Sequence, residues 1–149
     1  MSTPEITYII HIATTPEKLW EALTNPEALQ KNWGRIDSKW TVGSKVTEVD
    51  DASNVLWSGT VSRSERPRIL SFTLGEGEGV EPTDVTFELT DPASPVEPAS
   101  SVVRLVVTHS GFGANSKMTS GCARAWTEIM SSVKSYVETG RSLGFAWKH

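Results

Sequence analysis

The chain has 149 residues and a formal net charge of −4, from 14 basic and 18 acidic side chains. This length suits one domain, which can bury roughly 70% of its unfolded surface and so needs no disulfide or metal for stability. The mild excess of acid argues against nucleic acid or an anionic membrane as the main partner, because both need a clustered basic face.

Cys122 is the only cysteine, so the chain can form neither an internal disulfide nor a zinc site of several thiolates. The first residues lack a basic segment followed by an apolar one, which argues against a signal peptide. No apolar stretch approaches the roughly 20 residues that a membrane helix requires. We therefore expect a cytoplasmic protein without a metal or cofactor and without membrane insertion.

Residues 6–13 are rich in β-branched and aromatic types, which predicts a first strand. A helix is expected to begin in the segment 14–17, which carries two threonines, a first-turn proline and a capping-box glutamate three positions after Thr14. Asn25 and Pro26 then begin a second short helix, which is expected to end near Trp33.

From residue 35 to residue 109 the hydrophobic period changes to two, which predicts an antiparallel meander. Six further strands are expected at 35–41, 45–49, 55–64, 69–74, 83–90 and 102–109. The intervening segments 75–82 and 91–101 are rich in glycine or proline and are expected to be loops.

Helical spacing returns between about residue 116 and residue 139, where a wide apolar stripe predicts one amphipathic helix. At 1.5 Å per residue this helix would be roughly 35 Å long, enough to cover a sheet. We therefore expect a single α+β domain over residues 1–149, with about seven strands curved around the C-terminal helix. Such a curve would leave a cavity between sheet and helix.

Seven segments in chain order also carry a family pattern: IHIATTPEKLWEALTNPEALQKNWG, WTVGSKV, LWSGTV, ERPRILSFTL, DVTFEL, VVRLVVTHSGF and AWTEIMSSVKSYVETG. Together they resemble the START-like superfamily, also called SRPBCC or Bet v-type helix-grip proteins. Within it the chain looks closest to stand-alone homologues of the heat-shock-protein-90 ATPase activator. It departs from that pattern at Ala125, where glycine is common, and in a longer loop at 91–101.

The resemblance implies a helix-grip fold with a deep, largely apolar pocket for lipids, polyketides or other hydrophobic molecules. It carries no shared catalytic motif, so it assigns no catalytic residue. From strand alternation and the helical stripe, the expected cavity lining is Trp57, Phe72, Phe87, Leu105, Val107, His109, Met118, Cys122 and Trp126. The alternative is that these side chains simply fill the core. Trp20 and Trp33 are expected to pack the short helices, whereas Trp40 and Trp147 stay unassigned.

His109 is the best candidate for polar chemistry, because it falls on the inward side of the last strand and has a near-neutral reference pKa. It could bind a ligand or act as a base, or it could satisfy loop backbone groups at the cavity rim. His11 is expected to face solvent. Cys122 is expected to be a small buried apolar residue rather than a nucleophile. Glu48 and Glu88 have no second carboxylate spaced to share acid–base work.

These observations favour a protein that binds a hydrophobic small molecule: a lipid, a polyketide or an aromatic compound. The first alternative is a cyclase- or aromatase-type enzyme that uses His109 in the same cavity, although no recognisable catalytic motif is present. The second is a chaperone-activator-like protein–protein module. Chaperone-activating members carry an extra N-terminal domain, for which 149 residues leave no room, so no chaperone partner is expected. Pairing of two copies through a sheet edge is left open.

Overall fold

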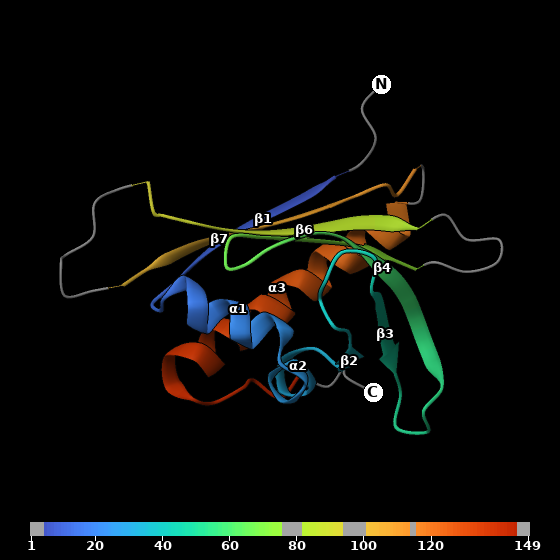
Figure 1. The fold of residues 1–149 in the computed structure, drawn as a ribbon, viewed down its shortest axis with the longest axis horizontal. Coiled ribbons are helices and arrows are strands. Elements are labelled where there is room, and N and C mark those ends of the chain that lie inside the picture. The colour runs from blue at the N-terminus through green and yellow to red at the C-terminus, as the bar shows by residue number, and fades with distance from the viewer. Residues whose placement is uncertain (1–4, 76–81, 94–100, 114–115, 146–149) are drawn as a thin grey trace.

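Seven antiparallel strands and three helices make up the fold in the computed structural model, which describes residues 5–75, 82–93, 101–113 and 116–145 (Figure 1). The elements in chain order are β1 (Ile6–Ile12), α1 (Pro16–Thr24), α2 (Pro26–Asn32), β2 (Arg35–Asp37), β3 (Lys45–Val49), β4 (Val55–Glu65), β5 (Ile69–Leu74), β6 (Thr83–Thr90), β7 (Val103–Ser110) and α3 (Ser116–Thr139).

The strands form one sheet in the order β1-β7-β6-β5-β4-β3-β2, with every neighbouring pair antiparallel. The first strand lies beside the last, with Ile6 opposite His109 and Ile12 opposite Val103. The register between β4 and β5 shifts near Val61, and such irregularities bend strands. Figure 1 shows the result, because β3 and β4 turn away from the direction of β1, β6 and β7. The sheet is therefore curved, as expected.

Close contact between β4 and β5 requires a glycine at position 59. A Cβ atom placed on Gly59 would lie 1.7 Å from the backbone oxygen of Thr73. The backbone N–H of Thr60 donates to the Thr73 hydroxyl at 2.9 Å, which fixes the two strands beside this point. The close approach of these two strands therefore depends on a residue without a side chain.

The short helices begin where the sequence predicts, although one detail of the cap differs. The side chain of Thr15, not Thr14, caps α1 by accepting from the backbone N–H of Lys18 at 3.3 Å. The expectation of a capping pair between Thr14 and Glu17 was therefore wrong. Asn25 caps α2 by accepting from two backbone N–H groups of its first turn, and the helix begins at Pro26.

The strand expected at 35–41 ends at Asp37, and the reason is Trp40. This residue has a φ of 55°, in the left-handed region, and its backbone N–H donates to the Ser38 hydroxyl. Its indole N–H donates to the backbone oxygen of Thr24 at 3.0 Å, and the ring is buried. A residue in this conformation cannot continue a strand. The other strand ends differ from the predictions by one residue at most, and α3 has the expected bounds.

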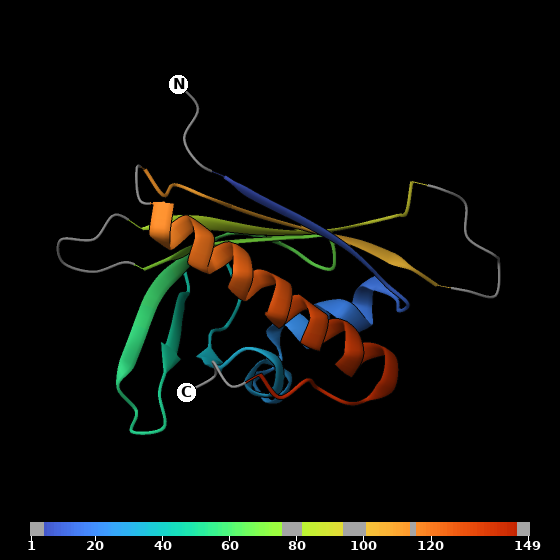
Figure 2. The same ribbon diagram turned by 180° about the vertical axis from the view of Figure 1, so that it is seen from behind.

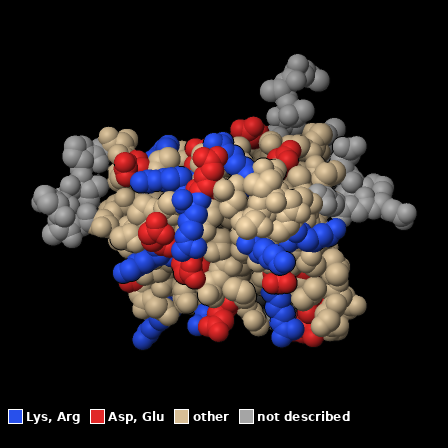
Figure 3. Space-filling view, in the orientation of Figure 1, with Lys and Arg blue, Asp and Glu red and all other residues tan. Residues whose placement is uncertain are grey.

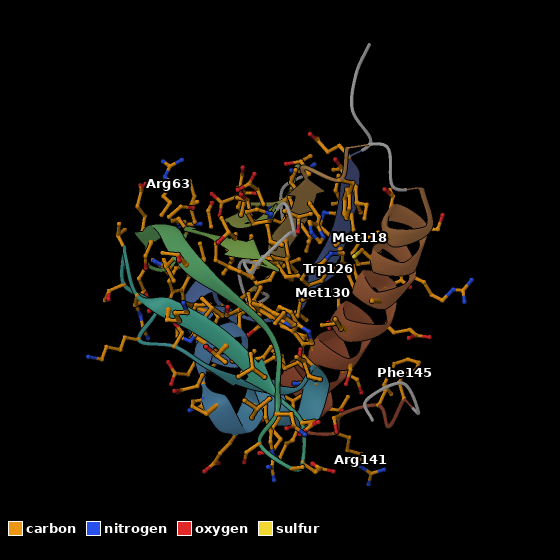
Figure 4. All side chains as sticks on the ribbon, turned by 90° about the vertical axis from the view of Figure 1, so that its right-hand side faces the viewer. Arg63, Met118, Trp126, Met130, Arg141 and Phe145 are labelled. Atoms are coloured by element: carbon orange, nitrogen blue, oxygen red, sulfur yellow. The ribbon has the colours of Figure 1, made fainter. Side chains whose placement is uncertain are left out.

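Helix α3 crosses the concave side of the sheet diagonally (Figure 2). Met118, Trp126 and Met130 point from α3 toward the sheet, whereas Arg63 and Arg141 point outward (Figure 4). The hydroxyl of Ser132 donates to Oδ1 of Asn32 at 2.8 Å, so a buried hydrogen bond ties α3 to α2. The same hydroxyl accepts from the backbone N–H of Leu143, which holds the segment after α3 against the helix.

On the face in Figure 3, basic and acidic side chains are interspersed. Within the described part of the chain, no helix is both long and apolar enough to cross a membrane. Trp147 and His149, and most of the two long loops, lie outside the described residues.

Candidate functional site

A cluster of aromatic rings occupies the inner side of the sheet, centred on Phe72 of β5. Phe72 is fully buried, and its ring centroid lies 6.3 Å from that of Trp57, 5.8 Å from Trp40 and 5.7 Å from Phe87. The rings of Trp57 and Phe72 are stacked, with 11° between their planes. Neighbouring strands therefore contribute rings that are already in contact with one another.

Helix α3 closes the cluster through Trp126. Its ring lies 5.7 Å from Phe87 and 5.2 Å from Trp33, measured between centroids. Trp33 also lies 6.0 Å from Trp57, so it joins the sheet side of the cluster to the helix side. We refer to the six rings as the aromatic cluster: Trp33, Trp40, Trp57, Phe72, Phe87 and Trp126.

The nine residues expected to line a cavity come from the sheet and from the facing side of α3. Six of them are at most 3% exposed: Phe72, Phe87, Leu105, Val107, His109 and Trp126. Trp57, Met118 and Cys122 are partly buried and pack against this core. A ligand-lining role for the set stays a prediction. Burial raises the pKa of the Cys122 thiol, which disfavours the reactive thiolate form.

His109 has protein partners for both ring nitrogens. The indole N–H of Trp126 donates to Nδ1 at 2.9 Å, so the ring proton of the neutral form lies on Nε2. Nε2 then donates to the Thr83 hydroxyl at 2.7 Å, and that hydroxyl donates to the backbone oxygen of Leu74. His109 thus links β7 to β6 and α3. Its direct partners are the side chains of Trp126 and Thr83, not the loop backbone groups that the sequence left as an alternative.

The surroundings of His109 also keep it neutral. The side chain is 1% exposed, and the Phe112 ring lies 4.4 Å away between centroids. Burial lowers the pKa of His109 from 6.5 to about 4, because the charged imidazolium loses its hydration. At neutral pH it is therefore an uncharged structural connector. Its use as a base by an enzyme remains a prediction from the sequence.

An open pocket of about 600 Å³ lies between α2 and the hairpin of β3 and β4. We call it the α2–β3 pocket. Trp33 lines it, so the pocket reaches the aromatic cluster from outside, and Leu56, which is 57% exposed, supplies an apolar rim. The remaining lining residues are Gln30, Gly34, Arg35, Glu48, Val49, Asp50, Asp51 and Ala52.

Glu48 is the carboxylate of this pocket that contacts the aromatic cluster. Its Oε1 accepts from the indole N–H of Trp57 at 2.7 Å. Its Oε2 lies against Gly34, where an added Cβ would come within 2.2 Å. Burial raises the pKa of Glu48, and the hydrogen bond from Trp57 partly offsets that effect. The pocket therefore holds a carboxyl group that takes up a proton more readily than an exposed glutamate.

Replacing Gly34 by alanine is expected to displace Glu48 from Trp57, because the new methyl group would occupy the place of Oε2. The loss of this hydrogen bond should lower the free energy of unfolding by about 1–2 kcal/mol. NMR should show the pKa of Glu48 returning toward its ordinary value and a shifted Trp57 indole signal. The control is G121A, since nothing lies within 4 Å of a Cβ at that exposed helical position. An unchanged Trp57 signal in G34A would contradict the geometry.

Sequence reasoning missed Trp33 and the position of the open pocket. Trp33 follows the last residue of α2, and its φ of −134° and ψ of −72° belong to neither helix nor strand. No periodicity therefore indicated the direction of its side chain, whose ring contacts Trp57, Phe72 and Trp126. The irregular pairing of β3 with β4 at Glu48 and Val49 likewise has no clear sequence signal. Among the described residues, no group of acidic, histidine and cysteine side chains could hold a metal ion.

A curved antiparallel sheet that grips a long C-terminal helix, with two short helices after its first strand, defines a helix-grip domain. A match to a family sequence model shows which family the chain belongs to. The chain belongs to the family described as Activator of Hsp90 ATPase homolog 1-like protein, whose sequence model matches residues 13–138. A search of curated protein sequences found no significant match.

Solved structures confirm the fold. MLL2253 from Mesorhizobium loti has 23% identity and a TM-score of 0.77, covering 91% of this chain and 97% of that one. The Aha1 dimer from Colwellia psychrerythraea has 23% identity and a TM-score of 0.74, covering 92% and 98%. DynU16, a protein of the dynemicin biosynthetic locus, has 19% identity and a TM-score of 0.75, covering 93% and 48%. Identities this low establish the fold alone.

Proposed function

We propose that the protein binds a hydrophobic small molecule in the α2–β3 pocket, against the ring of Trp33. The observation that carries this proposal is the double position of Trp33, which lines an open pocket and also contacts Trp57 and Trp126. The volume of about 600 Å³ lies within the range of small-molecule sites. A ligand resting there would bury apolar surface on Leu56, which is 57% exposed, and would meet the small part of Trp33 that is exposed, 6%.

The aromatic cluster would form the wall behind the ligand. Trp33 separates the open pocket from Phe72 and Trp126, whose rings it contacts. A larger ligand that displaces the Trp33 ring would therefore meet the residues that the sequence indicates as a cavity lining. In this proposal the pocket is the entrance and the nine predicted residues are its inner extension.

The polar groups of the pocket differ in how freely they can meet a ligand. Asp50 accepts from the backbone N–H groups of Ala52 and Asn54, which fix it in the turn before β4 and lower its pKa. Arg35 lies 4.0 Å from Asp51, both largely exposed. Glu48 is the carboxylate next to the Trp33 wall, and we propose that it orients a polar substituent of the ligand.

Replacing Leu56 by serine is expected to weaken the binding of an uncharged fluorescent probe, N-phenyl-1-naphthylamine, by about three- to tenfold, since the rim loses apolar contact. The matched control is V55S, because Val55 is 62% exposed on the same strand and does not line the pocket. Probe fluorescence titrations of the three proteins provide the test. Equal affinities in all three, or no saturable binding by the wild type, would contradict the proposal.

A cyclase-type enzyme that uses the same pocket is the second candidate, and two observations support it. One is the structural likeness to DynU16, from a biosynthetic locus. The other is Glu48, a carboxyl group with a raised pKa inside the pocket, which suits acid–base work. If the protein is such an enzyme, E48Q should lose turnover while keeping probe affinity, whereas loss of turnover in H109Q alone would favour His109.

The similar structures and the family description also point to protein partners. The Colwellia protein was solved as a dimer, and a homodimer of this chain remains a prediction. We do not extend to this chain the chaperone activation named in the family description. Lipid as the ligand class and the cytoplasm as the location likewise remain predictions.

A further inference from the structure

A second pocket, of about 470 Å³, lies at the start of α1, far along the chain from the α2–β3 pocket. We call it the α1 pocket. The link between β1 and α1, the start of β7 and the end of α3 meet around it. Its lining residues are Ala13, Thr14, Thr15, Lys18, Ser101, Val102 and Val137.

Thr14 is the unusual residue of the α1 pocket. Thr14 is only 8% exposed, and none of the described residues forms a hydrogen bond with its hydroxyl. A buried hydroxyl without a partner costs free energy, so such groups are normally paired. Thr15, its neighbour, is occupied as the cap of α1. The pocket wall therefore holds a hydroxyl that a bound molecule would satisfy.

The charge around this hydroxyl favours an anion. Lys18 lines the pocket and forms no ion pair with a described residue, and no carboxylate is among the lining residues. The N-terminus of α1, a helix of nine residues, adds the positive end of its dipole. The α2–β3 pocket has the opposite character, with three carboxylates and one guanidinium in its lining.

Two carboxylates stand near the α1 pocket, and both already have partners. Glu138 accepts from the backbone N–H of Ala13 and from the ammonium of Lys134, each at 2.7–2.8 Å. Those contacts lower the pKa of Glu138 and offset its charge. Glu17 lies 3.5 Å from the guanidinium of Arg66. Glu138 is thus paired on two sides, whereas Glu17 shares the Arg66 guanidinium with Glu21, which lies 3.3 Å from it.

We propose that the α1 pocket binds an oxyanion, a carboxylate or phosphate group, through the hydroxyl of Thr14 and the ammonium of Lys18. Thr14 donates its hydroxyl proton to one oxygen of the anion, and Lys18 supplies the counter-charge together with the helix end. Ala13, Val102 and Val137 give the site an apolar side, which suits a small organic acid or phosphoester. The inference is independent of the proposed function of the α2–β3 pocket.

The test is an NMR titration of the full chain, with sodium phosphate in one arm and sodium acetate in the other, at constant ionic strength. Saturable shifts are expected for the backbone N–H groups of residues 13–15, 17–18, 101–102 and 137. T14V should weaken binding about tenfold by removing a hydrogen bond to a charged group. K18Q should weaken it about fivefold by removing an exposed charge. K39Q is the control, since Lys39 is an exposed lysine outside the pocket.

Each outcome decides the proposal. Binding of phosphate alone, acetate alone or both, with loss in T14V and K18Q but not K39Q, supports it and identifies the preferred group. T14S, which keeps the hydroxyl, should retain most of the affinity, and K18Q gives the answer if T14V does not fold. The proposal would be overturned if no saturable shifts appeared, or if T14V and K18Q bound the anion as tightly as the wild type. It would also be overturned if K39Q lost as much affinity as K18Q.

Discussion

Replacing Phe72 by alanine is expected to lower the free energy of unfolding by about 3–5 kcal/mol. Phe72 is fully buried at the centre of the aromatic cluster, with the rings of Trp33, Trp40, Trp57 and Phe87 around it. The surrounding rings are held by several different elements, so they cannot move far enough to fill the space left by the deleted phenyl group. The loss therefore includes a cavity cost as well as the lost burial of the ring.

Urea unfolding of F72A and the wild type measures this loss, and the dependence on urea should stay the same if the native fold is kept. V55A is the control, because Val55 is 62% exposed and makes no comparable contacts. It should change stability by about 0.5 kcal/mol or less. A similarly small change in F72A would mean that the aromatic cluster is not the tightly packed core described above.

The second large effect is a loss of stability in acid that depends on His109. The pKa of His109 is about 4 in the folded protein and about 6.5 when the chain unfolds, because burial disfavours the imidazolium. The unfolded chain therefore binds the proton more strongly than the folded protein. The stability that neutral His109 contributes is lost as the pH falls from 6.5 to 4. Between pH 7 and pH 4 this amounts to about 3 kcal/mol.

Comparing the wild type with H109Q separates the effect of His109 on stability from the effects of other titrating groups. The raised pKa of Glu48 acts in the opposite sense, since its contribution to stability is lost as the pH rises through its folded pKa. The difference in unfolding free energy between the wild type and H109Q removes that effect, and it should fall by about 3 kcal/mol between pH 7 and pH 4. H11Q, at an exposed position of β1, should keep the wild-type pH dependence. A pH-independent difference for H109Q would show that His109 is protonated as easily in the folded protein as in the unfolded chain.

The fold followed from local patterns because those patterns persist over many residues. Helix α3 was predicted with its observed bounds, since its apolar stripe continues over six turns and ends at Gly140, which has a φ of 83°. The strands β5 and β6 followed from alternation in the same way. Trp40 could not be placed, because its left-handed backbone depends on the contact of its indole with Thr24, a tertiary interaction.

The candidate site could be predicted from the sequence only in part, because it too depends on tertiary contacts. Strand alternation and the helical stripe indicated which rings face inward, and Phe87 does contact both Phe72 and Trp126. The sequence could not show that the space among them is occupied by a further ring, because Trp33 follows the end of a helix. It also could not show that the open pocket lies at the β3–β4 hairpin, where the strand pairing is irregular.

The binding proposal is tested most directly by the indole N–H signals of the tryptophans during a titration with N-phenyl-1-naphthylamine. Trp33 and Trp57 should shift in a saturable way, because one lines the α2–β3 pocket and the other bonds to Glu48 within it. Trp40, whose indole donates to the backbone oxygen of Thr24 and which does not line the pocket, should change little. A titration that leaves Trp33 and Trp57 unshifted, or that shifts only Trp20 and Trp40, would contradict the account.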